Sequence, residues 1–125
     1  MTHTIDATAV VDRYLAALNE ADPADRRRKI EQAWAPDGGM TDPPLTGQGH
    51  AGLVELGDAL HAHYAGHAFA RTSEVDVHHD RFRVAWVLTG PDGTPVLTGM
   101  DTGVLNPDGT VGQVVGFFGE LTPRA

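Results

Sequence analysis

W-A-P-D-G-G-M-T-D-P-P, residues 34 to 44, is the stretch at which a helical pattern gives way to extended chain. We expect the helix to stop at Pro36 and the chain to turn at Gly38 and Gly39, because proline interrupts helices and glycine tolerates turn geometry. Asp42 precedes two prolines, and a residue before proline is restricted to extended geometry. A carboxylate on a stiff segment is what an acid/base site needs. Asp-Pro is also a common turn pair, so a purely structural role is the alternative.

Composition limits the classes of protein to which the chain can belong. Its 125 residues fit one domain, residues 1–125, with 41% hydrophobic and 21% charged residues. A net charge of −8 disfavours a nucleic-acid surface, and the basic cluster at residues 26–29 is expected to be a solvated helix face. The absence of cysteine excludes disulfides and thiolate chemistry. No apolar run is long enough to span a membrane and no signal-peptide pattern is visible, so a cytoplasmic location is expected.

Three helices are predicted from apolar residues that recur every three or four positions over residues 6–21, 22–34 and 50–64. Tyr14 falls on the buried side of the first helix, where its hydroxyl needs a partner unless it reaches water. The second helix is short and highly charged, and we expect it on the outside of the fold. A turn at residues 47–49 is expected before the third helix.

The remainder of the chain is predicted to be β-structure. Apolar and polar residues alternate, and turn sequences containing proline, aspartate and glycine separate the segments. The expected strands are residues 68–79, 82–88, 96–105 and 111–118. Helices followed by a meander of antiparallel strands indicate an α+β fold, with the helices packed on one face of a curved, mainly antiparallel sheet.

Asp101 is an unusual residue for the middle of a strand. By alternation it shares a face with Leu97, Gly99, Gly103 and Leu105. A carboxylate on a buried face must be paired or neutral, and the glycines leave space in which a ligand could lie. If the other face is the buried one, Asp101 is a solvent-side residue.

Seven histidines raise the question of a metal site. His63 and His67 have the spacing of one helical turn, but Gly66 lies between them and no acidic residue completes a known ligand pattern. We therefore expect surface histidines, no bound metal and no cofactor.

Four segments together resemble one family: V-V-D-R-Y-L-A-A-L-N at 10–19, T-D-P at 41–43, M-D-T at 100–102 and F-F-G-E at 117–120. The chain resembles ketosteroid isomerase and the SnoaL-like polyketide cyclases, which share the cone-shaped fold named after nuclear transport factor two. The resemblance covers nearly the whole chain. Gly57 and Thr102 depart from the isomerase pattern, which suits a sister family with an altered pocket.

The resemblance implies catalytic roles for three residues. Tyr14 and Asp101 match the oxyanion hole of the isomerases, and Asp42 matches their proton-shuttling base. Asp101 would donate only if an apolar setting kept it protonated, as in the isomerases, while Asp42 would stay ionised. The residues expected to line the substrate pocket are Trp34, Leu60, Gly99 and Phe118.

The implied function is acid/base chemistry at the carbon next to a carbonyl in an apolar small molecule. Isomerisation of a ketosteroid-like compound is the first hypothesis, and intramolecular aldol cyclisation of a polyketide is the nearest enzymatic alternative. A non-catalytic ligand-binding or dimerisation module, in which Asp42 and Tyr14 bond to each other, is a third reading. The family also implies a homodimer through the outer face of the sheet, with Trp86 a contact if its side chain points away from the pocket.

Overall fold

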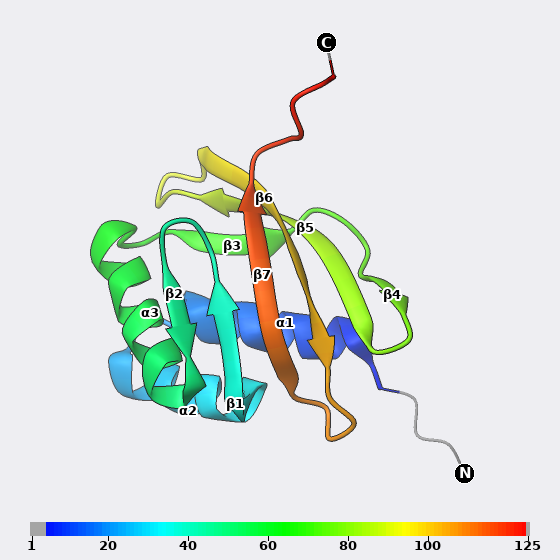
Figure 1. Ribbon diagram of the computed structural model, residues 1–125. Coiled ribbons are helices and arrows are strands. Elements are labelled where there is room, and N and C mark those ends of the chain that lie inside the picture. The colour runs from blue at the N-terminus through cyan, green and yellow to red at the C-terminus, as the bar shows by residue number, and fades with distance from the viewer. Residues whose placement is uncertain (1–4, 125) are drawn as a thin grey trace.

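The computed structural model describes residues 5–124, which form three helices and one seven-stranded sheet (Figure 1). The helices are α1 (Ala7–Asn19), α2 (Pro23–Ala33) and α3 (Gly49–His63). The strands are β1 (Trp34–Thr41), β2 (Thr46–Gln48), β3 (Ala68–Arg71), β4 (Asp76–His78), β5 (Arg81–Thr89), β6 (Pro95–Leu105) and β7 (Val111–Phe118). The α+β prediction is therefore confirmed.

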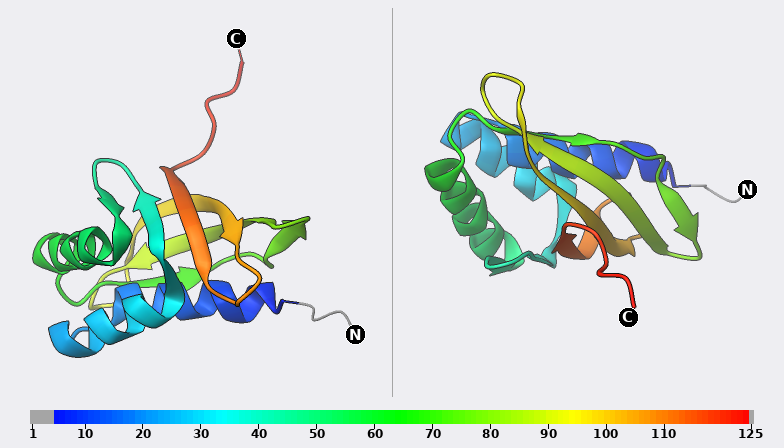
Figure 2. Two further views of the ribbon diagram at one scale, coloured as in Figure 1. Left: turned by 60° about the horizontal axis from the view of Figure 1, so that its bottom comes forward. Right: turned by 90° about the horizontal axis from the view of Figure 1, so that it is seen from above.

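The sheet has the order β2-β1-β7-β6-β5-β3, with β4 paired to β5. β1 and β7 run parallel and the other pairs are antiparallel. The sheet is strongly curved, α1 crosses one of its faces, and α3 packs on β1 and β2 (Figure 2). The curvature and the helices enclose a core built on α1 that includes Val11, Tyr14 and Leu18.

The predicted helices are confirmed to within about two residues at each end. Asp6 caps α1 by accepting a hydrogen bond from the amide of Ala9, and Asp22 caps α2 with Pro23 as its first residue. The side-chain caps and the proline are thus what fix the starts of these helices. Within residues 5–124, no helix has both the length and the apolar character needed to cross a membrane.

The predicted turns at both ends of the β1–β2 segment are wrong. Gly38 and Gly39 lie inside β1, which pairs with β2 on one side and with β7 on the other. These glycines serve close packing: a Cβ on Gly38 would stand 2.9 Å from Trp34 Cδ1, and one on Gly39 would overlap the Gln48 side chain. Residues 46–48 form β2 instead of a turn, and the change of direction comes at Gly49, with φ of 73°.

The predicted strand at residues 68–79 is two short strands. β3 and β4 pair with different halves of β5, which is long enough to support both. Asn19 fixes the start of β3 by exchanging two hydrogen bonds with the backbone of Phe69. The polar residues Thr72, Ser73 and Glu74 lie between the two strands and interrupt the pattern.

Arg26 corrects the prediction of a solvated basic face on α2. Its side chain is buried, donating to the carbonyl oxygens of Glu20 and Ala21 and to Asp58 Oδ1 at 2.8 Å. It thereby ties the end of α1, the start of α2 and the middle of α3 together. The neighbouring Arg27 is exposed, so the cluster is part solvated and part structural.

Arg26→Met is expected to destabilise the protein by about 1–3 kcal/mol, because two partly buried carbonyl oxygens and Asp58 lose a charged donor. The measurement is chemical denaturation, with Arg27→Met as the matched control because that side chain is exposed. An equal effect of the two substitutions would contradict the structural role given to Arg26.

Candidate active site

A buried hydrogen-bonded group joins α1, β5 and β6. The Tyr14 hydroxyl donates to Asp101 Oδ2 at 2.7 Å, and the Trp86 indole N–H donates to Asp101 Oδ1 at 2.9 Å. Asp101 is 1% exposed and Tyr14 is fully buried. The strand register that places Trp86 opposite Gly99 allows this contact, because a Cβ at Gly99 would overlap the indole ring. Asp101 therefore lies on the buried face and is paired, which decides between the two alternatives that the sequence left open.

Asp42 lies directly after β1, where the chain turns through Pro43 and Pro44, joined by a cis peptide bond. Its amide donates to the carbonyl oxygen of Leu45 at 2.8 Å, which closes this turn. Asp42 is 5% exposed, and its Oδ1 is buried with no hydrogen-bond partner among residues 5–124. A buried carboxylate oxygen with no donor carries a large desolvation cost when charged.

The two carboxylates approach each other over Gly116 of β7. A Cβ built there would overlap Asp42 Oδ1 and stand 2.7 Å from Asp101 Oδ1. Burial, and then the proximity of Asp101, raise the pKa of Asp42 from 3.8 to about 7. Burial also raises the pKa of Asp101, although the hydrogen bonds from Tyr14 and Trp86 oppose the shift. The pKa of Tyr14 is raised by burial and by the adjacent Asp101.

A cavity of about 270 Å³ opens beside Asp42. Apart from Asp42, its wall is aromatic, aliphatic and proline side chains with two polar residues, His63 and Tyr64, from the end of α3. The remaining lining residues are Pro43, Pro44, Leu45, Leu60, Phe69, Trp86, Leu88, Leu97 and Phe118. A largely apolar pocket with one carboxylate of raised pKa is the usual form of an acid/base site.

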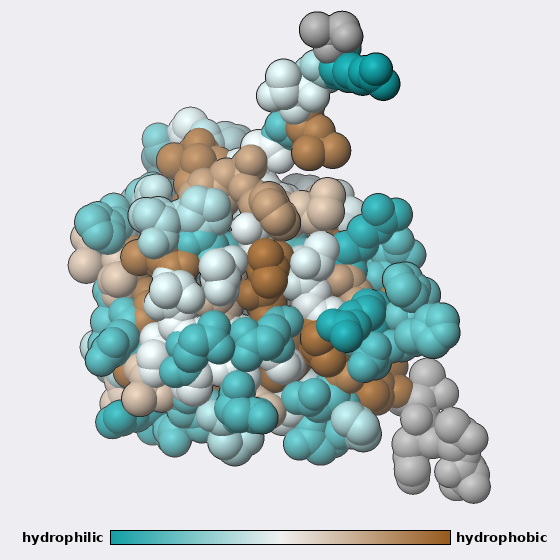
Figure 3. All heavy atoms as spheres, in the orientation of Figure 1, coloured by the Kyte–Doolittle hydropathy of each residue, from teal (hydrophilic) through white to brown (hydrophobic). Residues whose placement is uncertain are grey.

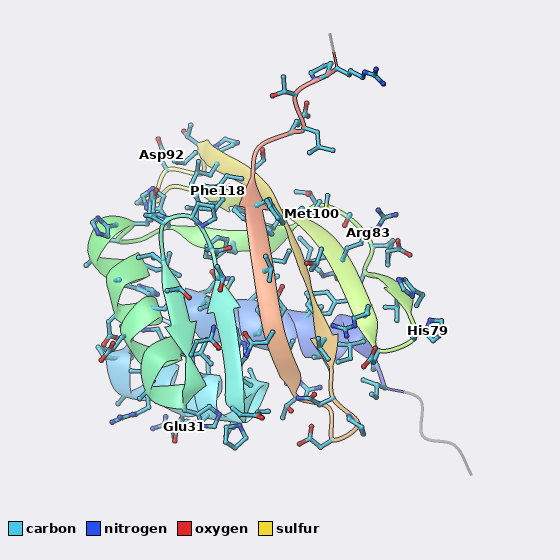
Figure 4. All side chains as sticks on the ribbon, viewed as in Figure 1. Glu31, His79, Arg83, Asp92, Met100 and Phe118 are labelled. Atoms are coloured by element: carbon cyan, nitrogen blue, oxygen red, sulfur yellow. The ribbon has the colours of Figure 1, made fainter. Side chains whose placement is uncertain are left out.

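The residues predicted to bind substrate divide into two groups. Leu60 and Phe118 line the cavity, and Phe118 lies near the end of β7 (Figure 4). Trp34 is 1% exposed and packs on Tyr14, with ring centroids 5.4 Å apart, so it belongs to the core. Gly99 lies against the Trp86 ring, outside the cavity wall.

The catalytic residues predicted from the resemblance are also divided. Asp42 lines the cavity, whereas Tyr14 and Asp101 do not. Trp86, whose side chain lines the cavity and also bonds to Asp101, connects the buried group to the pocket. Trp86 therefore points to the pocket side and, at 2% exposure, does not meet the condition set for a dimer contact.

Sequence reasoning missed Trp86, Phe69, His63 and Tyr64 as pocket residues. The alternation that puts Trp86 on one face with Phe82 and Val84 was visible, but not which face held the pocket. His63 was interpreted as a surface histidine, and it is indeed exposed, but it also lines the cavity. The ends of helices are set by tertiary contacts, so no local pattern marked Tyr64 as a lining residue.

The histidines do not form a metal-binding cluster with other side chains in the described part of the chain. Among residues 5–124, no group of three or more histidine, cysteine, aspartate or glutamate side chains is placed to hold an ion. His63 and His67 are separated by the turn at Gly66, with φ of 74°.

Solved structures of known proteins resemble this chain over nearly its full length. A candidate isomerase of the SnoaL-like family from Agrobacterium tumefaciens str. C58 is 34% identical, with 90% of this chain and 97% of that chain covered and a TM-score of 0.85. A candidate polyketide cyclase from Sinorhizobium meliloti is 21% identical, with 87% and 94% covered and a TM-score of 0.68.

A protein from Catenulispora acidiphila DSM 44928 with a ketosteroid isomerase-like fold, in complex with trimethylamine, is 16% identical, with 91% and 86% covered and a TM-score of 0.71. At this identity the likeness shows the fold alone. No protein-family model matches the chain, and no curated protein sequence matches it.

Proposed function

The chain belongs to the SnoaL-like family, and on that premise we propose that it is a small-molecule enzyme that moves a proton at the carbon next to a carbonyl group. Asp42 is the general base, and the substrate is an apolar carbonyl compound bound in the cavity. Allylic isomerisation of the ketosteroid isomerase type is the first candidate reaction.

The observation that carries this proposal is the state of Asp42. A carboxylate at the wall of an apolar cavity, with its pKa raised to about 7, is a much stronger base than an exposed aspartate and is still half ionised at neutral pH. Its backbone is held by β1 and by the hydrogen bond to Leu45, so the base is on a rigid element.

The negative oxygen that develops when a proton leaves such a carbon needs hydrogen-bond donors. The family resemblance implies Tyr14 and Asp101 as these donors, a role that requires a protonated Asp101, and Trp86 lies between them and the cavity. Tyr64 and His63, which line the cavity themselves, are alternative donors that do not depend on the protonation state of Asp101. Asp42 is the base in both arrangements.

Intramolecular aldol cyclisation remains the second enzymatic candidate, because it begins with the same proton abstraction. The cavity of about 270 Å³ lies just under the usual range of ligand pockets, about 300–1,000 Å³, which favours a compact substrate in either reaction. The non-catalytic reading required a bond between Asp42 and Tyr14, but Tyr14 donates to Asp101 instead.

Turnover measurements test the proposed function. The parent protein is assayed with a 5-ene-3-ketosteroid and with a short linear poly-β-ketone, following the absorbance of the conjugated product. Because the base must be ionised, kcat/KM is expected to rise with pH and level off above about 7. No turnover of either compound class would remove the isomerase and cyclase readings, and binding of a phenol without turnover would support the ligand-binding module.

A homodimer through the outer face of the sheet remains part of the proposal. Met100 of β6 and Phe117 of β7 are direct cross-strand neighbours on that face, 41% and 62% exposed, with Val115 beside them. Brown, hydrophobic atoms accordingly lie over β7 on the face seen in Figure 3. An exposed apolar group of this kind suits burial against a second copy.

Phe117→Glu is expected to convert a dimer to a monomer by placing two charges in the interface. Light scattering coupled to size-exclusion chromatography gives the mass directly, and Gln32→Glu, at an exposed position of α2 away from the sheet, is the control for added charge. A monomeric parent protein would contradict the dimer.

A further inference from the structure

Asp101 is surrounded by donors, which favours its ionised form. Each of its oxygens accepts one hydrogen bond, Oδ2 from the Tyr14 hydroxyl and Oδ1 from the Trp86 indole. The indole N–H can only donate, so Asp101 Oδ1 must act as an acceptor there. Hydrogen bonds to a carboxylate stabilise its charge. These two hydrogen bonds thus favour an ionised Asp101 that acts as an acceptor, in contrast to the protonated donor that the family resemblance implied.

Asp42 has the opposite environment. Its Oδ1 is buried and accepts no hydrogen bond, and it faces the same point above Gly116 as Asp101 Oδ1. A proton on Asp42 Oδ1 would supply the missing partner, because the acid could then donate toward an oxygen that is already an acceptor. Two neighbouring carboxylates rarely both ionise in a buried site.

We propose that Asp42 and Asp101 are one coupled acid pair that holds a single proton between them until Asp42 ionises, with that proton on Asp42 and Asp101 as the charged, fixed member. Asp101 is then a positioning residue that sets how readily Asp42 gives up its proton. Tyr14 and Trp86 hold Asp101, and Gly116 keeps the space between the two acids free. The pairing is a property of the site whatever the reaction, and its effect on activity rests on the proposed function.

The other charged and titratable groups around Asp42 within the described residues do not replace Asp101 in this role. Tyr14 approaches from α1, but its hydroxyl is committed to Asp101. His63 and Tyr64 of α3 line the cavity, and β7 contributes Gly116, which has no side chain. β5 contributes Trp86, which does not titrate.

Carboxyl-carbon NMR titration tests the pair directly in the parent protein, Asp101→Asn and Trp86→Phe. In the parent, the Asp42 signal is expected to titrate with a midpoint near 7, and the Asp101 signal to respond in the same step. Asp101→Asn removes the neighbouring charge, so the Asp42 midpoint is expected to fall by about one pH unit or more. Asp37→Asn is the control, because that exposed carboxylate on β1 leaves the pair intact.

Trp86→Phe keeps an aromatic ring at the pocket but removes one donor from Asp101. The upper titration step is then expected to move from the Asp42 signal to the Asp101 signal, because the less stabilised carboxylate takes the proton. If Asp101→Asn does not fold, Trp86→Phe alone tests whether the two acids are coupled.

An Asp42 signal that titrates near the ordinary 3.8 in the parent would overturn the pair. So would an unchanged midpoint in Asp101→Asn, or an unchanged pattern in Trp86→Phe. A coupled titration in a protein without turnover would remove the proposed function and leave the pair, whereas turnover with uncoupled titration would remove the pair alone.

Discussion

Asp42→Asn is expected to lower kcat by about 10²–10⁴-fold, the usual contribution of a general base. The amide has the same shape as the carboxylate but cannot accept the proton. Because Leu60, Phe118 and the other apolar residues still form the cavity, KM should change little. Steady-state kinetics on the compound that the parent turns over fastest gives both parameters.

Stability separates this result from simple damage to the fold. An asparagine amide can donate toward Asp101 Oδ1 and carries no buried charge, so the thermal midpoint of Asp42→Asn is expected to equal or exceed that of the parent. Asp37→Asn, on the exposed side of β1, is the matched control for kinetics. Full activity in Asp42→Asn would remove Asp42 as the base.

Gly116→Ala is expected to have the second largest effect. The added methyl group would overlap Asp42 Oδ1 and crowd Asp101 Oδ1 at 2.7 Å, so Asp42 must leave its place. A displacement of about 1 Å in a catalytic group lowers the rate by about 10²-fold. Overpacking of a buried site also costs about 1–3 kcal/mol of stability. Steady-state kinetics and chemical denaturation measure the two effects.

Gly112→Ala is the control for this substitution. Gly112 lies on the same strand, and a Cβ there would meet Asn106 and Val104 at 3.5 Å, an ordinary contact. Its stability should stay within about 0.5 kcal/mol of the parent, with unchanged kcat. If both alanine variants behave alike, the effect belongs to the strand and the space between the carboxylates has no special role.

Local patterns predicted most of the fold. The helix starts were predicted to within about one residue because capping depends on neighbouring residues, here Asp6 and Asp22, and alternation predicted β7 to the residue. Gly38 and Gly39 were wrongly predicted to form a turn, because glycine is needed there for a different reason: the side chains of Trp34 and Gln48 leave no room for a Cβ. This close packing results from strand pairing and tertiary contacts, which a local sequence pattern does not reveal.

The candidate site was predicted only in part, because its arrangement also depends on tertiary packing. Family resemblance selected Tyr14, Asp42 and Asp101, and burial of all three follows from the structure. Asp42 lines the cavity, whereas Tyr14 and Asp101 lie behind Trp86. Trp86 belongs to none of the motifs that carried the resemblance, so the sequence did not predict this arrangement. Arg26 is a similar case, since its acceptors at Glu20, Ala21 and Asp58 come together only in the folded chain.

The parallel pairing of β1 with β7 has a consequence for how the protein is made. Residues 34–41 find their second neighbour in residues 111–118, which are synthesised much later. Until then the acid at position 42 has no Gly116 beneath it and no dry surroundings, so a nascent or truncated chain carries an ordinary aspartate there. The raised pKa of Asp42, on which the proposed function depends, is therefore acquired only once β7 has paired with β1, a contact of long sequence separation that is expected to form slowly.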